Sequence, residues 1–274
     1  MSDVIPLGWR LERLGSIAQV VSGSTPSRFA PEFWQGGAIP WVTPTDITRT
    51  AGRYLSESNE HITELGLQSC GTKLLPSGAL LMTSRATLGE LRIATTSVCT
   101  NQGFKSLVLS KEIDTHYLYY QLDLNKERYG ALGIGSTFLE VNKKDTENFE
   151  LLIAPAAEQR RIAEILSTLD ETIEQTEALI AKYQQIKAGL MHDLLTRGVT
   201  LDGKLRPTRA EAPHLYKQSP LGWIPKEWTC ENLGAFCDVT KLAGFEFTNV
   251  IKYRDDGEII ALRALNIKNE ELDL

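Results

Sequence analysis

The chain has 274 residues, of which 42% are hydrophobic and 23% charged, and its formal net charge is −6. This length and composition predict a globular chain of about two domains with a sizeable core. A membrane protein is not expected, because no apolar run approaches the roughly 18 residues that span a bilayer. A secreted protein is not expected either, because the N-terminus lacks the plan of a signal peptide. The negative net charge argues against a protein that binds nucleic acid through excess positive charge alone.

The expected location is therefore the cytoplasm, with no membrane partner. The four cysteines and four histidines are scattered and show no zinc-ligand spacing, so no metal site is expected.

Residues 1–154 are predicted to form an α+β domain that consists mostly of strands. Helical spacing predicts one helix from His116 to Leu132, and HITELGLQ at 61–68 is a shorter candidate. Short apolar runs bounded by Gly, Pro, Ser or Asn favour strands. These runs are SIAQVVS at 16–22, AIPWVT at 38–43, GALLMTS at 78–84, LRIATT at 91–96 and FKSLVLS at 104–110.

Residues 155–198 carry an uninterrupted helical pattern with good signals at both ends. Pro155 suits the first helical position, and Gly198 lies just past the last turn. Such a rod would be about 60 Å long, more than one small domain can bury. Apolar residues recur at alternating steps of four and three, which is typical of a coiled-coil seam, so we expect a second helix against it. The expected interface residues are Ile162, Leu166, Leu169, Ile173, Ile180, Tyr183, Leu190 and Leu194.

A sequence repeat predicts that the first domain begins again after the helix. GWRLERLGSIAQVV and EWTCENLGAFCDVT align Trp9 with Trp228 and Leu14 with Leu233. The alternative is that two strand–turn regions share these residues by chance. Residues 199–219, rich in Gly, Pro and polar residues, are predicted to be a linker, and residues 220–274 an incomplete second domain.

Motifs for catalysis are not recognisable in this sequence. It has no phosphate-binding loop of the Walker type, and GALGIGST follows a helical pattern instead of opening a helix after a strand. No local motif marks a catalytic triad or a pair of acid–base carboxylates. We therefore expect no catalytic residues and no bound cofactor.

Polar side chains are instead concentrated in loops. Arg can pair with guanine, Asn and Gln with adenine, and Thr can contact the thymine methyl group, so such loops suit DNA recognition. For any single residue, the alternative is that it forms a turn or a cap. The segments are SGSTPSR at 22–28, TPTDITR at 43–49, TSRATLG at 83–89, TNQGFKS at 100–106 and GIGSTF at 133–138.

Several of these stretches together resemble the specificity subunit of type I restriction-modification enzymes. The resemblance covers the whole chain and is carried, in order, by GWRLERLGSIAQVVSGSTPS, IPWVTPTDI, LPSGALLMTSRATLG, TNQGFKSL, GSTFLEVNKKD, PAAEQRRIAEILSTLDETIEQ and KAGLMHDLL. In that family, each target-recognition domain recognises one half of a bipartite DNA sequence, and long helices hold two such domains apart.

The resemblance implies a non-catalytic protein whose chemistry resides in its partners. These would be double-stranded DNA, methylation subunits that use S-adenosylmethionine, and a restriction/translocase subunit that uses ATP and Mg²⁺. It also implies that the recognition surface corresponds to the polar loops. The residues expected to bind DNA are Thr25, Ser27, Arg28, Thr45, Thr83, Arg85, Asn101, Gln102, Lys105 and Thr137.

The sequence departs from the family pattern because it holds one complete domain, one helix and the start of a second domain. The chain is then either a truncated product or a half-subunit whose spacer helix pairs with that of a second copy in a homodimer. A different function would be a helical adaptor or decoy that assembles partners without recognising DNA. A third hypothesis makes the chain the recognition portion of a fused methyltransferase–endonuclease.

Overall fold

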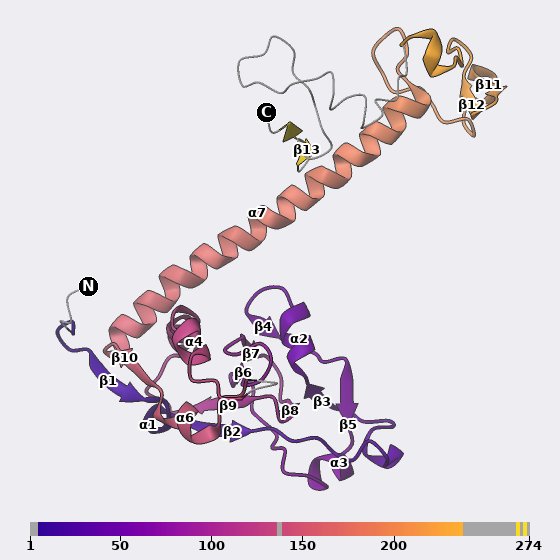
Figure 1. Cartoon of the computed structure of the whole chain (residues 1–274). Coiled ribbons are helices and arrows are strands. Elements are labelled where there is room, and N and C mark those ends of the chain that lie inside the picture. Colours follow the sequence, from indigo (N-terminus) through magenta and orange to yellow (C-terminus); the bar gives the residue numbers. More distant parts are fainter. Residues whose placement is uncertain (1–4, 136–138, 238–266, 269–270, 273–274) are drawn as a thin grey trace, which may run out of the picture. The chain divides into compact units, whose positions relative to one another are not determined.

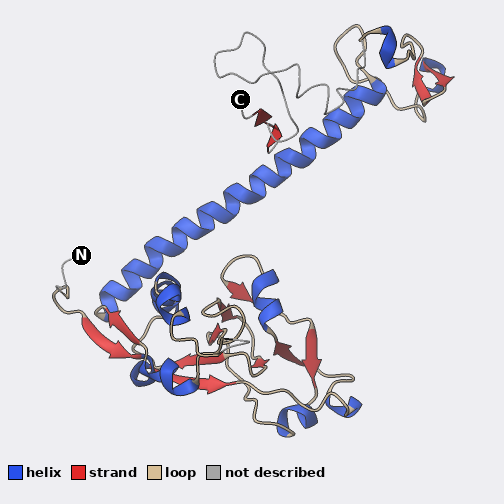
Figure 2. Cartoon of the chain, in the orientation of Figure 1, coloured by secondary structure: helices blue, strands red, loops and turns tan. Residues whose placement is uncertain are grey.

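The computed structural model describes residues 5–135, 139–237, 267–268 and 271–272 (Figure 1). The chain divides into two compact units, Met1–Tyr183 and Gln184–Leu274. The first unit contains an α+β domain with two mixed sheets, and a long helix follows it in the chain (Figure 2). The predicted fold class is therefore confirmed.

The larger sheet of the first unit has five strands. Three neighbouring pairs are antiparallel, and the last pair, β7 with β4, is parallel. The short strands suit these apolar runs, because successive side chains can enter the two opposite faces of the sheet. In spatial order the strands are β2 (Ala18–Ser22), β9 (Lys105–Leu109), β6 (Leu80–Met82), β7 (Leu91–Ala94) and β4 (Tyr54–Leu55).

A smaller sheet contains three strands, with β3 in the middle, antiparallel to β5 and parallel to β8. Trp41 of β3 is only 2% exposed and packs with the buried Ile62 and Cys99. Each of the five runs predicted as strands thus contains a strand, in one sheet or the other. The strands are β5 (Glu60–Ile62), β3 (Ile39–Val42) and β8 (Cys99–Thr100).

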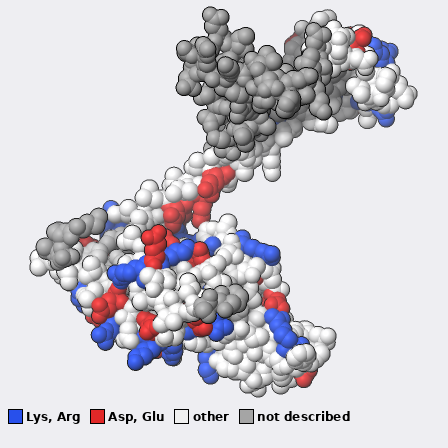
Figure 3. Space-filling model, viewed as in Figure 1, with Lys and Arg blue, Asp and Glu red and all other residues white. Residues whose placement is uncertain are grey.

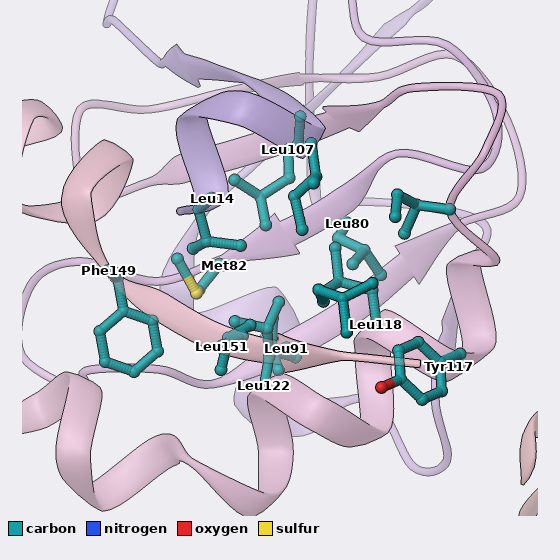
Figure 4. Packing of buried hydrophobic residues seen from close by; sticks show 14 of the residues in the cluster. Leu14, Leu80, Met82, Leu91, Leu107, Tyr117, Leu118, Leu122, Phe149 and Leu151 are labelled. Atoms are coloured by element: carbon teal, nitrogen blue, oxygen red, sulfur yellow. The ribbon is translucent and has the colours of Figure 1, made fainter. Parts of the chain in front are cut away.

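Both faces of the five-stranded sheet are buried. Leu80 and Met82 of β6 face a core formed with helix α4 and strand β10, in which Tyr117 and Leu151 also lie (Figure 4). Leu81, between them in sequence, faces a second core on the other side of the sheet. This alternation explains why β6 is a continuous apolar run instead of an alternating one.

Short helices connect these strands. The predicted helix at 116–132 is present but divides at Asn125 into α4 and α5, and Asp114 caps α4 by accepting from the Tyr117 N–H. The segment 61–68 is part strand and part helix. The helical elements are α1 (Leu14–Ile17), η1 (Pro31–Phe33), α2 (Pro44–Arg49), α3 (Glu64–Gln68), α4 (Thr115–Leu124), α5 (Lys126–Gly130) and α6 (Lys143–Asn148).

The first and last strands of the domain pair with each other. Strand β1 (Arg10–Arg13) is antiparallel to β10 (Glu150–Ile153). Two residues later α7 begins, and it runs over Ala156–Arg197. The predicted helix is thus confirmed to within one residue at each end, and Gly198, at φ +66°, donates its N–H to the Leu194 carbonyl.

The second unit contains small elements, described here by themselves. Residues predicted as a linker include a bridge between Val199 and Leu205 and a buried Arg206, 7% exposed. Most of the predicted second domain, residues 238–266, 269–270 and 273–274, lies outside the described residues. The elements are η2 (Pro213–Leu215), β11 (Tyr216–Ser219), β12 (Gly222–Pro225), η3 (Leu233–Ala235), β13 (Ile267–Lys268) and β14 (Glu271–Leu272).

One part of the predicted repeat can be compared directly. The Leu-Gly pair begins a short helical turn in both blocks, at Leu14 in α1 and at Leu233 in η3. The turn is α-helical in the first block and a 3-10 helix in the second, and the residues aligned with β1, 229–232, form no strand, so the repeat remains a prediction. Within the described part of the chain, no helix is both long enough and apolar enough to cross a membrane.

Candidate functional site

The polar loops predicted from sequence come together around the segment from Thr100 to Lys105. The Ser24 N–H donates to the Thr100 carbonyl at 3.0 Å, and the Asn101 N–H donates to the Val42 carbonyl at 3.1 Å. Gly23 is required at this crossing, because a Cβ there would lie 2.0 Å from the Asn101 carbonyl oxygen. Segments 22–28 and 100–106 are thereby joined through their backbones, and the 43–49 segment follows Val42 directly, with Pro44 beside Gly103.

The two remaining loops join the same cluster from the other side. The Ser84 N–H donates to the Gly103 carbonyl at 2.7 Å, and the Val141 N–H donates to the Ser84 carbonyl at 3.0 Å. Glu140 forms isolated β-bridges with both Arg85 and Ile134. Four of the loops therefore come together around Thr100–Lys105, and the described part of the fifth, residues 133–135, is joined to them through Glu140; we call this region the loop surface.

Four predicted residues present polar groups at the loop surface. The Thr25 hydroxyl donates to the Gln102 side-chain oxygen, and Gln102 is exposed. Thr45 is exposed in the first turn of α2. The Asn101 side-chain oxygen accepts from the Gly103 N–H at 2.8 Å, which leaves its amide nitrogen available as a donor.

Arg28, also predicted to bind DNA, is held by neighbouring side chains. Its guanidinium donates through both terminal nitrogens to Glu60 and stacks 3.8 Å from the centroid of the Trp34 ring. The Glu60 hydrogen bond raises the pKa of Arg28, and the same bond lowers the pKa of Glu60. Arg28 therefore stabilises its loop, and the adjacent exposed Ser27 accepts the Phe29 N–H at its hydroxyl.

A second ion-pair cluster lies under the 83–89 loop. Glu140 pairs with Arg85 at 2.7 Å and with Lys105 at 3.3 Å. The Lys105 side chain is 6% exposed and that of Arg85 is 43% exposed. Burial lowers the pKa of Lys105 in spite of Glu140, whereas these two cations lower the pKa of Glu140 against the effect of its own burial.

The structure places two predicted residues inside the domain and leaves one undescribed. Thr83 is 0% exposed, donates to the Thr87 carbonyl and accepts from the Glu90 N–H. Lys105 likewise lies beneath the surface. Thr137 falls outside the described residues.

Three residues of this region were missed by the sequence reasoning. Glu60 and Glu140 are the partners of the two arginines, and they lie 32 and 55 positions away in the chain, so no local motif links them. Phe29 is 99% exposed at the tip of the 22–28 loop. Its apolar side chain directly after an arginine in a polar loop is a signal that could have found it.

The tip of the 83–89 loop has an uncommon backbone conformation. Ala86 has φ +62°, the left-handed region that residues with a Cβ seldom adopt. The turn is fixed by the Thr87 N–H, which donates to the Arg85 carbonyl at 2.7 Å, and by the Gly89 N–H, which donates to the Thr83 carbonyl at 2.9 Å. This conformation fixes the backbone from which Arg85 extends.

The side chains of the site offer hydrogen-bond donors, acceptors and charges. In the described ranges, no three or more His, Cys, Asp or Glu side chains are grouped so that they could hold a metal ion. Burial raises the pKa of the Cys99 thiol to about 12, so it stays protonated and weakly nucleophilic. Basic and acidic side chains are interspersed over the visible face of the domain (Figure 3).

The predicted helix interface is a stripe of large apolar side chains on α7. From Leu169 to Leu194 its members are 42% to 62% exposed. Ile162 and Leu166, near the start of the helix, are partly buried. Such regular exposure of apolar residues indicates a surface that suits a partner helix.

Comparisons with known proteins identify relatives of this chain. Residues 6–185 match the family model described as type I restriction modification DNA specificity domain. The chain is 36% identical over 232 residues to the type I restriction enzyme MjaIX specificity subunit of Methanocaldococcus jannaschii, covering 84% of this chain and 52% of that protein. It is 28% identical over 163 residues to the EcoR124I/EcoR124II specificity subunit of Escherichia coli, covering 57% of this chain and 40% of the relative.

Solved structures share the fold. The HsdS subunit from Thermoanaerobacter tengcongensis matches with a TM-score of 0.50 at 23% identity, covering 67% of this chain and 41% of that one. A chain from a study of complex assembly and conformational transition of the type I R-M system matches with a TM-score of 0.53 at 25% identity, covering 70% and 44%. The chain spans about half the length of the curated relatives it matches. It belongs to the family of type I restriction-modification DNA specificity domains.

Proposed function

We propose that this chain is a non-catalytic, sequence-specific DNA-recognition component of a type I restriction-modification system. Its N-terminal domain would bind one half of a bipartite duplex target through the loop surface. The observation that carries the proposal is the meeting of polar loops around Thr100–Lys105, where backbone hydrogen bonds join the 22–28 and 83–89 loops to this segment. A family match over residues 6–185 supports the same function.

The loop surface divides into contact residues and residues that support them. Arg85 is the principal base-contacting candidate, because its half-exposed guanidinium can reach out of the surface and pair with guanine. Phe29 adds an exposed aromatic ring that can stack on a base or sugar. The other proposed contacts are Thr25, Ser27, Thr45, Asn101 and Gln102. Arg28, Thr83 and Lys105 hold the loops in place. Thr137 remains a proposed DNA contact on the basis of the sequence alone.

The long helix would serve as the spacer and assembly element. Its apolar stripe from Leu166 to Leu194 would pack against a second helix, and a second copy of this chain is one source of that helix. Ile162 instead packs against the core of the N-terminal domain. Methylation subunits would dock on this assembly and supply S-adenosylmethionine chemistry on adenine, and a restriction/translocase subunit would supply ATP- and Mg²⁺-dependent activity. The complex would work in the cytoplasm, and this chain would bind no cofactor itself.

DNA recognition can be tested by co-expressing the chain with the methylation subunit of its own system and mapping methylated adenines across the host genome. Arg85→Ala and Gln102→Ala should each change which sequence is methylated, because each removes a base-reading group, with about 1–3 kcal/mol of discrimination lost per base pair. Arg10→Ala and Gln19→Ala are matched controls on exposed strand positions away from the loop surface.

An unchanged methylated sequence in both loop variants would remove these residues from the recognition surface. A wild-type chain that directs no sequence-specific methylation, yet still binds its partner subunits, would favour an adaptor that does not recognise DNA.

Helix pairing can be tested by replacing Leu169 and Ile173 together with Asp. Two charges in the apolar stripe should abolish self-association or partner docking and leave the N-terminal domain folded. Thr168 and Thr172 on the same helix, outside the stripe, provide a matched double Asp control. Solution mass and circular dichroism are the measurements, and an unchanged mass in the Leu169/Ile173 variant would contradict the interface.

A further inference from the structure

The first turns of α7 touch the N-terminal domain along one stripe. The stripe consists of Gln159, Ala163, Ser167, Asp170 and Glu174, at steps of four, four, three and four. Side chains at this spacing project from one side of a helix. Two of them, Gln159 and Ala163, are 2% and 5% exposed, and the two after them approach α4 and the loop before β4.

The base of the stripe is fixed by hydrogen bonds of a buried amide. The Gln159 side chain accepts the Asp114 N–H at 2.9 Å and donates to the Ala154 carbonyl at 2.9 Å. It therefore joins the start of α7 to the N-cap of α4. This contact holds only the start of the helix. A second contact further along is needed to fix the direction of the helix axis relative to the domain.

Three turns further on, Arg53, which directly precedes β4 of the five-stranded sheet, reaches α7. Its side chain is 4% exposed and donates to Asp170 at 2.7 Å and to the Tyr120 hydroxyl at 3.0 Å. The Tyr120 hydroxyl in turn donates to the same carboxylate at 2.7 Å. We call Arg53, Tyr120 and Asp170 the helix anchor, and it is tied to the sheet because the Arg53 carbonyl accepts the Ile93 N–H at 2.8 Å.

The anchor stripe and the apolar stripe are neighbours on the helix surface. Four of the five positions that touch the domain lie one residue after a position of the apolar stripe: Ala163, Ser167, Asp170 and Glu174 follow Ile162, Leu166, Leu169 and Ile173. One residue is about 100° around a helix axis. The domain and any partner helix on the apolar stripe would therefore contact adjacent sides of α7.

We propose that the helix anchor sets the number of base pairs between the two halves of the DNA target. Arg53 is then a positioning residue: it contacts no DNA but fixes the orientation of the loop surface relative to the first turns of α7, Ala156–Glu174. The inference rests on the proposed function, because it assumes that the loop surface recognises one half-site of a bipartite target.

The geometry of DNA makes this orientation decisive. Adjacent base pairs are about 3.4 Å apart and turned by about 36°. A slip of one residue along α7 would move the domain by about 1.5 Å and turn it by about 100°, so even a partial slip would change the favoured gap by a base pair. Apolar contacts are non-directional, whereas charged hydrogen bonds from a buried guanidinium are directional and can exclude such slips.

The test uses the full chain with its methylation subunits and plasmids that carry both wild-type half-sites at every gap length around the native one. Asp170→Asn and Arg53→Met should methylate the same half-sites but lower the preference for the native gap over its neighbours by about tenfold. The matched controls are Glu164→Gln and Arg92→Met. Glu164→Gln affects only a surface pair with Arg161, and the wild-type Arg92 side chain donates to backbone carbonyls within the domain.

Asp170→Asn decides the matter if Arg53→Met fails to fold, because Asp170 is 37% exposed and lies outside the domain core. An Asp170→Asn protein that keeps the native gap preference overturns the anchor. A wild-type protein that methylates no bipartite sequence overturns the proposed function and the anchor together, so the two failures are distinguishable.

Discussion

The N-terminal domain holds arginines in two different ways on two of its surfaces. At the helix anchor, the Arg53 side chain is 4% exposed and its partners belong to α4 and α7. At the loop surface, the side chains of Arg28 and Arg85 are 49% and 43% exposed, and each pairs with one glutamate. The Arg53 guanidinium is therefore in a medium of low dielectric constant, whereas those of Arg28 and Arg85 are largely surrounded by water.

This difference separates stability from recognition. A buried ion pair is costly to break, because the remaining groups lose their partner in a medium that solvates them poorly. An exposed pair contributes about 1 kcal/mol or less and can exchange its carboxylate for another acceptor. The helix anchor therefore suits a permanent contact, and the loop surface suits a ligand that comes and goes.

Arg53→Met should have the largest effect on stability. It leaves the Tyr120 hydroxyl and Asp170 without their cation, which should lower the free energy of unfolding by about 3 kcal/mol. The estimate is at the lower end of the range for buried pairs because Asp170 is partly hydrated. Thermal unfolding measures the change. Arg161→Met, on an exposed pair of α7, should cost no more than about 0.5 kcal/mol, and equal losses in both variants would contradict the comparison.

Gly23→Ala should be next in size and should disturb the loop surface alone. Its Cβ would meet the carbonyl oxygens of Thr100 and Asn101, which are backbone atoms with little room to move. We expect a loss of about 2 kcal/mol, together with displaced loops and weaker DNA binding. Gly189→Ala is the matched change, because a Cβ there meets nothing within 4 Å and should stabilise the helix by about 1 kcal/mol. If Gly23→Ala and Gly189→Ala lowered the free energy of unfolding equally, the close approach of Gly23 to residues 100–101 would not be the cause.

Acid should weaken the loop surface through Glu60 and Glu140. Both carboxyls have a pKa below 4.5, the ordinary value for glutamate, in the folded protein, so the folded state binds fewer protons than the unfolded one. Their contribution is complete above pH 4.5 and is lost as the pH falls through the lowered pKa. Glu140→Gln should cost about 1 kcal/mol at neutral pH, and the difference should shrink as the pH falls below 4.5, measured by denaturant unfolding across that range. A pH-independent difference would exclude the ionic contribution.

Ala86→Gly should have the smallest effect on stability. Glycine relieves the left-handed conformation at φ +62° but adds freedom to the unfolded chain, so the two effects nearly cancel within about 1 kcal/mol. Binding should respond more than stability, because the backbone that carries Arg85 becomes less rigid. Unfolding and DNA-affinity measurements on one preparation would show this, and equal changes in both would argue against a role for the turn.

Local sequence patterns predicted the elements that depend on local interactions. The apolar runs gave the strands, and the period of α7 together with Pro155 and Gly198 gave its limits. Helix α2 was predicted as a loop because TPTDITR is short and polar. It forms because Thr43 and Asp46 complete a capping box and Ile47 is buried.

Ion pairs between residues far apart in the chain could not be predicted from local sequence patterns. Arg53 lies in a short turn with no local sign of its partner, which follows 117 residues later. Arg28 and Lys105 looked like free cations within polar loops, but Glu60 and Glu140 come from other segments. The loops come close together only because the strands between them pair in sheets, which local sequence patterns do not specify.

The pairing of β1 with β10 has a consequence for how such a domain can change over evolution. Arg10 lies opposite Ile153, and Arg13 lies opposite Glu150, so the chain enters and leaves the domain at one place. A segment whose two ends lie side by side can be exchanged as a cassette, because the flanking chain meets the same pair of attachment points whatever lies between them. Under the proposed function, recombination at these two strands would exchange the target sequence and leave the long helix unaltered.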